Sequence, residues 1–137
     1  MNWSSWAVAG VNEQGFREGW GATVPSYPSY RVLNAGGGVC RLQRPDHGAS
    51  VVQVRLFFHV ERPPVPVIRG RVGRHSWTWA PEPGWHTLQH ALPRGRGAAV
   101  LQFAVDAEDE PWFEVRVIEV RLLAPDDPRV RSGAETP

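Results

Sequence analysis

The sequence predicts an all-β protein, an antiparallel β-sandwich or jelly roll, and three observations support this fold class. Several short segments alternate between apolar and polar residues, which is typical of strands with one buried face. Fourteen glycines and thirteen prolines punctuate these segments, and none of them has the period of a helix of about ten residues or more. The 137 residues suffice for one compact domain.

The first 45 residues contain shorter and less regular strand patterns. We expect strands within residues 6–10, 15–21 and 30–45, separated by loops, with a flexible turn at the three glycines 36–38. Cys40 shares a face with Leu42 and is therefore expected to be a small buried hydrophobe. As the only cysteine it also excludes an internal disulfide and a multi-cysteine metal site.

Residues 50–60 give the clearest strand pattern, and residues 67–73 give a second one. In the second pattern Arg69 and Arg71 point outward, whereas Gly70 shares the inner face and indicates a bulge or a close neighbour. The inner face of the first pattern consists of Val52, Val54, Leu56, Phe58 and Val60.

Residues 75–80 and 84–93 are two further predicted strands, joined by a Pro-Glu-Pro-Gly turn at 81–84. The first places three ring side chains on one face, and the second directs Leu88 and Leu92 inward. If these strands pair as a hairpin, Trp79 and Trp85 lie near its tip. The three ring residues of the first strand are His75, Trp77 and Trp79.

Residues 98–106 and 112–123 complete the predicted sandwich. The first segment directs Leu101, Phe103 and Val105 inward, whereas the apolar phase of the second changes at Val117 and Ile118. One extra residue, a β-bulge, would keep both apolar sets of the last strand inward. Those sets are Phe113, Val115 and Val117, followed by Ile118, Val120 and Leu122. We therefore expect a β-sandwich domain at 1–123 and an irregular C-terminal tail at 124–137.

The charge balance argues against two classes of partner. Fifteen basic and fourteen acidic residues give a net charge of +1, which is too small to attract nucleic acid strongly. No apolar run approaches the ~20 residues that span a bilayer, and no signal-peptide pattern follows Met1. We expect neither nucleic-acid binding nor membrane insertion, and the compartment stays open.

The histidines and the acidic run are the candidate metal ligands of this sequence. His86 and His90 are four residues apart, which on a strand is ~13 Å and too far for one zinc ion. His90 is instead expected to be partly buried and hydrogen-bonded at the edge of the core. A calcium site made by Asp106, Glu108 and Asp109 is the alternative, because carboxylates suit that ion. Without the spacing of a calcium loop, we expect no cofactor.

The sequence contains none of the catalytic motifs that were sought in it. The patterns that carry a serine nucleophile, a phosphate-binding loop or a zinc-protease helix are absent. A small glycan-active hydrolase stays open as an alternative, because two carboxylates brought together by the fold could hydrolyse a glycosidic bond. The glutamates available for that role are Glu61, Glu82, Glu108 and Glu114.

Seven tryptophans make a ligand platform the main functional hypothesis. An indole offers a flat face to the C–H side of a sugar ring, and nearby polar groups can bind its hydroxyls. The alternative is that some of these rings plug the open end of the sandwich. The candidate ligand-binding residues are Trp77, Trp79, Trp85, Trp112, Arg69, Arg71, His86 and Glu82.

The order of strand patterns between residues 30 and 123 resembles the galactose-binding-domain-like jelly rolls, which include many carbohydrate-binding modules and discoidin-type domains. The resemblance rests on the segments VCRLQRP, SVVQVRLFFHV, PVPVIRGRVG, PGWHTLQHALP, AAVLQFAVDA and FEVRVIEVRLL. It implies a noncatalytic module that binds glycans or another surface through loops at one end. Those loops vary so widely in the family that no ligand residue is transferred.

We therefore expect a noncatalytic module that binds carbohydrate by indole stacking. The alternative is a structural protein, such as a virion decoration or fibre component, whose exposed Trp and Arg form subunit contacts in a homo-oligomer. An open groove with at least two exposed Trp faces would favour the first. A broad flat apolar patch or an extended terminal arm would favour the second.

Overall fold

The computed structural model describes residues 4–45, 49–106 and 112–131. Within these residues the secondary structure is entirely β, and every paired strand is antiparallel, as the alternating sequence patterns predict. None of them forms a helix long and apolar enough to cross a bilayer. The strands are β1 (Trp6–Val8), β2 (Arg31–Val32), β3 (Gly38–Gln43), β4 (Ser50–Val60), β5 (Val67–Val72), β6 (His75–Trp79), β7 (Gly84–Leu92), β8 (Ala98–Asp106) and β9 (Phe113–Leu123).

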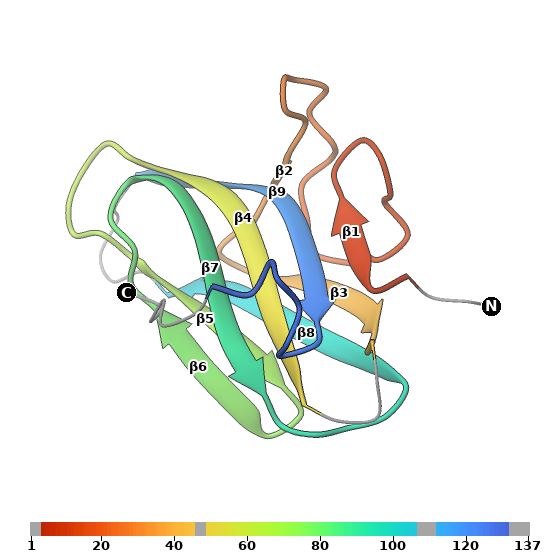
Figure 1. Ribbon diagram of the computed structural model, residues 1–137. Coiled ribbons are helices and arrows are strands. Elements are labelled where there is room, and N and C mark those ends of the chain that lie inside the picture. The colour runs from red at the N-terminus through yellow and green to blue at the C-terminus, as the bar shows by residue number, and fades with distance from the viewer. Residues whose placement is uncertain (1–3, 46–48, 107–111, 132–137) are drawn as a thin grey trace.

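Two sheets stack face to face, which confirms the predicted β-sandwich (Figure 1). The five-stranded sheet has the order β1-β9-β4-β7, with β2 also paired to β9. The four-stranded sheet has the order β3-β8-β5-β6. The strands β6 and β7 are therefore edge strands of different sheets.

The core lies between the two sheets and follows the predicted alternation. Val52, Val54, Leu56 and Phe58 of β4 are buried, and Cys40 is fully enclosed as the sequence indicated. Gly70 also has the expected close neighbour, because a Cβ there would lie 2.3 Å from Cζ2 of Trp77. From β8, the side chains of Leu101, Phe103 and Val105 are buried.

Residues 75–80 and 84–93 do not pair as a hairpin, so the condition that would place Trp79 and Trp85 at its tip is not met. β6 pairs with β5, and β7 pairs with β4, so the turn at 81–84 carries the chain from one sheet to the other. The ladder between β4 and β7 runs continuously from the Ser50–Leu92 pair to the Phe58–Gly84 pair. β7 is the edge strand of its sheet, so among the described strands it pairs with β4 alone.

The expected β-bulge in β9 is confirmed. Arg55 of β4 pairs with Glu119, but the next residue, Leu56, pairs with Val117. Ile118 is the extra residue, and its carbonyl accepts a hydrogen bond from the amide of Ala9. The predicted inward direction of Ile118 is wrong: this side chain is buried, but it lines a groove on the outer face. A bulge allows this because two neighbouring residues oppose a single partner.

The segment after β9 crosses the outer face of β4 and β7, where Figure 1 draws it in dark blue. Buried Gln53 donates a hydrogen bond from Nε2 to the carbonyl of Arg129, at 2.9 Å. Gln89 donates to the carbonyl of Arg131 at 3.0 Å and accepts from its amide at 3.1 Å. Residues 124–131 are thus fastened to the five-stranded sheet, while the division into a domain at 1–123 and a tail at 124–137 stays a prediction.

Candidate functional site

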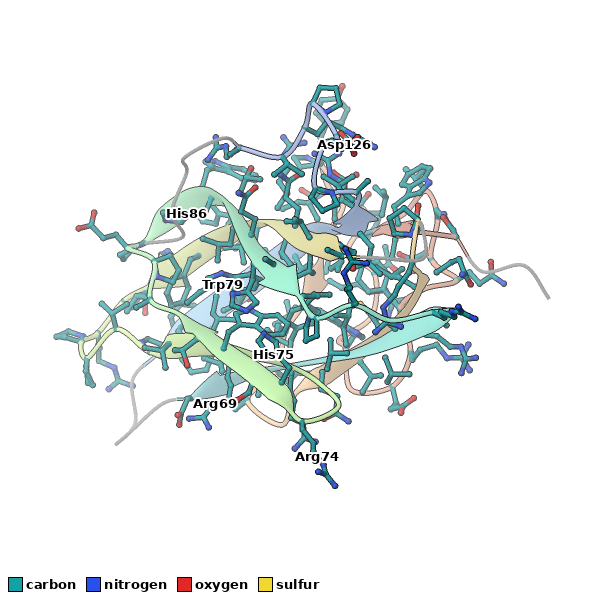
Figure 2. All side chains as sticks on the ribbon, turned by 60° about the horizontal axis from the view of Figure 1, so that its bottom comes forward. Arg69, Arg74, His75, Trp79, His86 and Asp126 are labelled. Atoms are coloured by element: carbon teal, nitrogen blue, oxygen red, sulfur yellow. The ribbon has the colours of Figure 1, made fainter. Side chains whose placement is uncertain are left out.

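The two tryptophans of β6 do not form an exposed platform, so this part of the sequence prediction is wrong. Trp77 is 7% exposed and Trp79 is 1% exposed. Their face of β6 is turned toward the other sheet, and Figure 2 shows Trp79 directed into the interior between the ribbons. The Trp79 ring stacks on Phe103 with 6.3 Å between centroids, and its Nε1 donates to the carbonyl of Gln89. These rings belong to the core.

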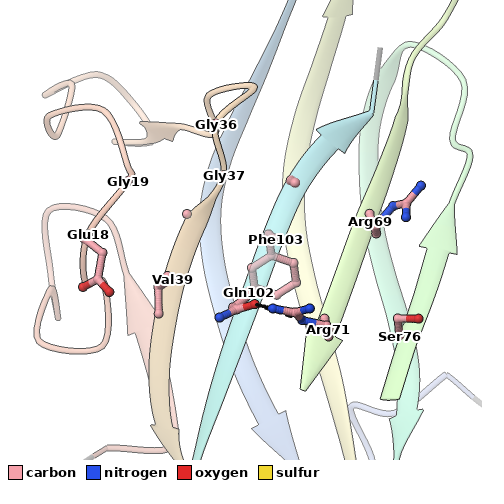
Figure 3. Close-up of a pocket in the computed structure, with 12 residues that line it drawn as sticks. Glu18, Gly19, Gly36, Gly37, Val39, Arg69, Arg71, Ser76, Gln102 and Phe103 are labelled. Atoms are coloured by element: carbon pink, nitrogen blue, oxygen red, sulfur yellow. Dashed lines mark hydrogen bonds between the residues drawn. The ribbon is translucent and has the colours of Figure 1, made fainter. Parts of the chain in front are cut away.

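Arg69 and Arg71 project from the outer face of the four-stranded sheet, where they line a hollow of about 540 Å³ (Figure 3). Both cations have partners. Arg71 donates to Oε1 of Gln102, and Arg69 lies 2.5 Å from a carboxylate oxygen of Asp106. Among the described residues of the lining, Phe103 is the one aromatic residue, and it is buried. This hollow offers polar groups but no exposed ring.

Trp85 lies on the outer face of the opposite sheet, so the prediction that groups it with Arg69 and Arg71 is wrong. It is 57% exposed. Its neighbour His86 has Nε2 at 2.6 Å from the carbonyl oxygen of Glu82. These three predicted site residues therefore lie together at the start of β7.

An aromatic groove surrounds Trp85 on the outer face of the five-stranded sheet. Its position follows from strand register, since Phe57 of β4 pairs with Trp85 on one side and with Arg116 of β9 on the other. All three face outward because their neighbours along each strand face the core. The groove has a volume of about 240 Å³. It is lined by Ser26, Tyr27, Pro28, Tyr30, Phe57, Trp85, Arg116 and Ile118.

Ring contacts hold the floor of the aromatic groove. The Phe57 and Trp85 centroids are 5.0 Å apart with the planes inclined at 58°. The guanidinium carbon of Arg116 lies 4.9 Å from the Tyr30 centroid and 5.7 Å from that of Phe57. Arg116 also donates from Nε to the Glu114 carboxylate, and this hydrogen bond raises the pKa of Arg116. A permanent cation is therefore held between two aromatic faces.

One wall of the groove is the segment that carries Tyr27 and Tyr30. It is closed by paired main-chain hydrogen bonds between Val24 and Tyr30, at 2.8 and 3.2 Å. Its base is tied by Arg31, which donates from Nε and Nη2 to Glu13 and from Nη1 to the carbonyl of Gly21. This anchoring leaves Tyr27 fully exposed above the groove.

Glu13 stabilises this anchor as a carboxylate. Burial raises the pKa of Glu13, but hydrogen bonds from Arg31, Thr23 and the Gly10 amide outweigh burial and leave the pKa below its ordinary value. Oε1 accepts from both Arg31 and Thr23, while Oε2 accepts from Gly10 at 2.9 Å. The wall therefore depends on an ionised Glu13.

Trp112, the remaining predicted tryptophan, is 42% exposed. Its ring meets that of His59 edge-on, with 5.3 Å between centroids. His59 follows Phe57 by two residues on β4, so both face outward and are separated by ~7 Å along the strand. Trp112 therefore lies on the same outer face as Trp85, beyond the aromatic groove.

No group of three or more metal-ligating side chains occurs among the described residues. Of the calcium candidates, Asp106 pairs with Arg69, whereas Glu108 and Asp109 lie outside the described residues. His90 is partly buried and contacts a ring nitrogen of His75, as its predicted place at the core edge suggested.

Two of the candidate carboxylates for hydrolysis, Glu61 and Glu114, lie near one another, because the amide of Glu61 donates to the carbonyl of Trp112, two residues before Glu114. Glu114 is paired with Arg116, and Glu61 and Glu82 have exposed side chains. Glu108 lies outside the described residues.

Four residues of the aromatic groove were not predicted from the sequence to be site residues. Phe57 and Arg116 were recognised only as members of strands, and Tyr27 and Tyr30 lay in a region without clear periodicity. One signal was available: Phe57 occupies the face of its strand that also carries Gln53 and Arg55. A large aromatic residue on a polar strand face indicates a surface contact.

No protein-family model matches the chain, and no curated protein sequence matches it. Among solved structures, the chain is similar to SGBP-B from a complex xyloglucan utilization locus in Bacteroides uniformis, with a TM-score of 0.46 and 16% sequence identity. The match covers 87% of this chain and 49% of that one, so this chain spans about half of that structure's length. The fold and the site therefore rest on the geometry described above.

Proposed function

We propose that this protein is a noncatalytic carbohydrate-binding module whose ligand lies in the aromatic groove. The observation that carries the proposal is Trp85, an indole 57% exposed on a sheet face and supported from below by Phe57. A ring fixed in this way offers its face to a ligand without losing much conformational freedom. Sugars suit such a face because one side of a pyranose ring presents C–H groups.

Polar groups next to Trp85 supply the second half of sugar recognition. Arg116 keeps further N–H donors beyond the one that binds Glu114, and Tyr27 presents its hydroxyl above the groove. At about 240 Å³ the groove is smaller than the roughly 300–1,000 Å³ of pockets that enclose drug-sized ligands. This size suits a shallow contact with one face of a glycan.

The hollow on the four-stranded sheet is a poorer candidate for the same ligand, although it is larger. Its two arginines are engaged by Gln102 and Asp106, so a ligand would have to replace existing contacts. The described residues of its lining also include no exposed aromatic ring. The aromatic groove, by contrast, offers an exposed ring on which a sugar can stack. Stacking is the contribution to sugar binding that depends least on the orientation of the hydroxyl groups.

A glycan array followed by titration calorimetry on the best ligand tests the proposal. We expect Trp85→Ala to weaken binding about 10-fold or more, because a central aromatic contact contributes about 2 kcal/mol. Trp6→Ala is the matched control, since Trp6 is 41% exposed on β1 and does not line the groove. It should leave the affinity unchanged.

Two results would overturn the proposal, one for its ligand and the other for its site. One is a failure of every glycan on the array to bind while the protein forms a discrete oligomer, which would favour a subunit of an assembly. The other is glycan binding that Trp85→Ala leaves intact, which would place the ligand elsewhere on the molecule.

A further inference from the structure

We propose that the glycan is acidic, and that a basic subsite next to Trp85 binds its carboxylate or sulfate group. This inference rests on the proposed function and adds the chemical class of the ligand. The basic subsite is a hollow of about 300 Å³ lined by Arg55, Trp85, His86, Thr87 and Arg131.

Trp85 connects the basic subsite to the aromatic groove, because it lines both. The strand register places the two sites in successive rows of the sheet. Phe57 pairs with Trp85 in one row, and Arg55 pairs with Thr87 in the next outward-facing row. Two residues along a strand span ~7 Å. A glycan that stacks one ring on Trp85 can therefore bring a neighbouring substituent to Arg55.

Arg131 reaches this subsite because the segment after β9 is fastened in place. Its amide and carbonyl are both bound by the side chain of Gln89, at 3.1 and 3.0 Å. Two residues earlier, the carbonyl of Arg129 accepts from buried Gln53. The segment up to Arg131 therefore crosses the sheet along a fixed path and brings Arg131 to the hollow that Trp85 also lines. This path supplies a second guanidinium that the sheet itself does not provide.

The charge of the basic subsite is of one sign. Its lining contains two arginines, and no carboxylate of a described residue contributes to it. His86 also lines it, but His86 pairs in register with the core residue Leu56, so its imidazole lies on the inner side of the sheet. The nearest acidic neighbour in the ladder is Glu119, which pairs with Arg55 in register. Its carboxylate lies 3.4 Å from Nη1 of Arg121. Arg129 is paired with Asp127, whereas Arg131 has no ion pair with any residue that the structure describes.

This arrangement selects for an anion with two or more oxygens. Guanidinium groups bind carboxylate and sulfate through parallel N–H donors, which gives direction as well as charge. A uronic acid residue and a sulfated sugar both carry such oxygens. In both cases a ring stacked on Trp85 would be followed by a negative substituent at Arg55 and Arg131.

The test compares glycans that differ only in the charged group. Oligogalacturonate is measured against its methyl ester, and chondroitin sulfate against desulfated chondroitin, by calorimetry on the full chain. The first pair reports on carboxylate and the second on sulfate. We expect at least one acidic form to bind roughly 10-fold more tightly than its matched form, and this preference should fall with added salt.

Charge-matched variants locate the preference. The double variant Arg55→Gln/Arg131→Gln should reduce the ratio of the affinities for the acidic glycan and its matched form to nearly 1, because both guanidinium groups are lost. Arg74→Gln/Arg94→Gln removes the same charge from exposed positions outside the hollow, and Figure 2 shows Arg74 pointing away from the body of the protein. This control should keep the preference. Gln89→Ala should lower it without touching the ligand, since Arg131 loses its anchor.

The outcomes separate the two proposals. If the acidic and neutral forms bind equally well and Trp85→Ala still weakens glycan binding, the basic subsite is overturned and the carbohydrate function stands. A preference for acidic forms that survives Arg55→Gln/Arg131→Gln would also overturn it. A failure of all glycans to bind would overturn both.

Discussion

The Nε2 atoms of His75 and His90 lie 2.9 Å apart at the edge where β6 of one sheet meets β7 of the other. A hydrogen bond between two imidazole nitrogens needs one donor and one acceptor, so one of the rings must be neutral. The His90 ring also stacks on Trp77, with 4.6 Å between centroids and 8° between planes. This contact connects the two sheets at an open edge of the sandwich.

The histidine contact predicts that stability falls in mild acid. Burial, followed by the charge of His75, holds the pKa of His90 below its ordinary value of 6.5. The unfolded chain therefore binds the proton more tightly than the folded protein does. The contribution of His90 is complete above pH 6.5 and is lost as the pH falls through the lower pKa of the folded state. Urea denaturation between pH 8 and pH 5 should show a smaller loss in His90→Gln than in the wild type; parallel profiles would contradict this.

The contact between Gly70 and Trp77 predicts a steep cost for a single methyl group. A Cβ at position 70 would lie 2.3 and 2.4 Å from two atoms of the buried indole. We expect Gly70→Ala to reduce the free energy of unfolding by about 2 kcal/mol, because the ring must move within a packed core. Gly36→Ala is the control, since nothing lies within 4 Å of a Cβ there. Equal urea midpoints for the two variants would refute the expectation.

The hydrogen bonds of Glu13 predict that a change at this residue increases the mobility of the segment that carries Tyr27 and Tyr30, although Glu13 does not itself line the groove. Glu13→Gln removes the charge that binds Arg31 and should cost about 1–2 kcal/mol. Hydrogen exchange of the amides at 23–31 should accelerate, whereas exchange in β4 should change little. Glu18→Gln, at an exposed position of the same N-terminal region, should do neither. Unchanged exchange at 23–31 in Glu13→Gln would show that the wall is held by other contacts.

The hydrogen bonds of Gln53 predict that this side chain holds the segment after β9 against the five-stranded sheet. Its amide donates to the Arg129 carbonyl, and its Oε1 accepts from Nε and Nη2 of Arg121 at 2.8 and 2.5 Å. Gln53→Ala should cost about 2 kcal/mol, because Arg121 loses two hydrogen bonds to a buried side chain and keeps, among the described residues, only its ion pair with Glu119. It should also speed hydrogen exchange at 124–131. Gln102→Ala, on the exposed outer face of the other sheet, should be nearly neutral; slow exchange retained in Gln53→Ala would contradict this role.

Strand patterns predicted the fold class, because each strand can be recognised from its own residues. The phase change at Val117 and Ile118 located the bulge for the same reason. Sheet membership could not be predicted in this way, since it depends on which distant strand lies alongside and not on the residues of the strand itself. The turn at 81–84 therefore suggested a hairpin, although β7 pairs with β4.

The candidate site was only partly predictable. Alternation showed that Trp77 and Trp79 share a face, but not whether that face meets solvent or the other sheet. Trp85 was identified correctly as an exposed indole, whereas the residues around it come from three other segments of the chain. Their proximity follows from the register of β4 with β7 and β9, which no local pattern records.

Ile118 shows how this surface can change while the interior does not. Without that residue, Val117 and Glu119 would follow one another and keep their present partners on β4, Leu56 and Arg55. A one-codon insertion or deletion at this point would therefore add or remove an apolar side chain in the groove and leave the core alignment untouched. Ligand preference in such a protein can diverge by changes of length as well as of residue type.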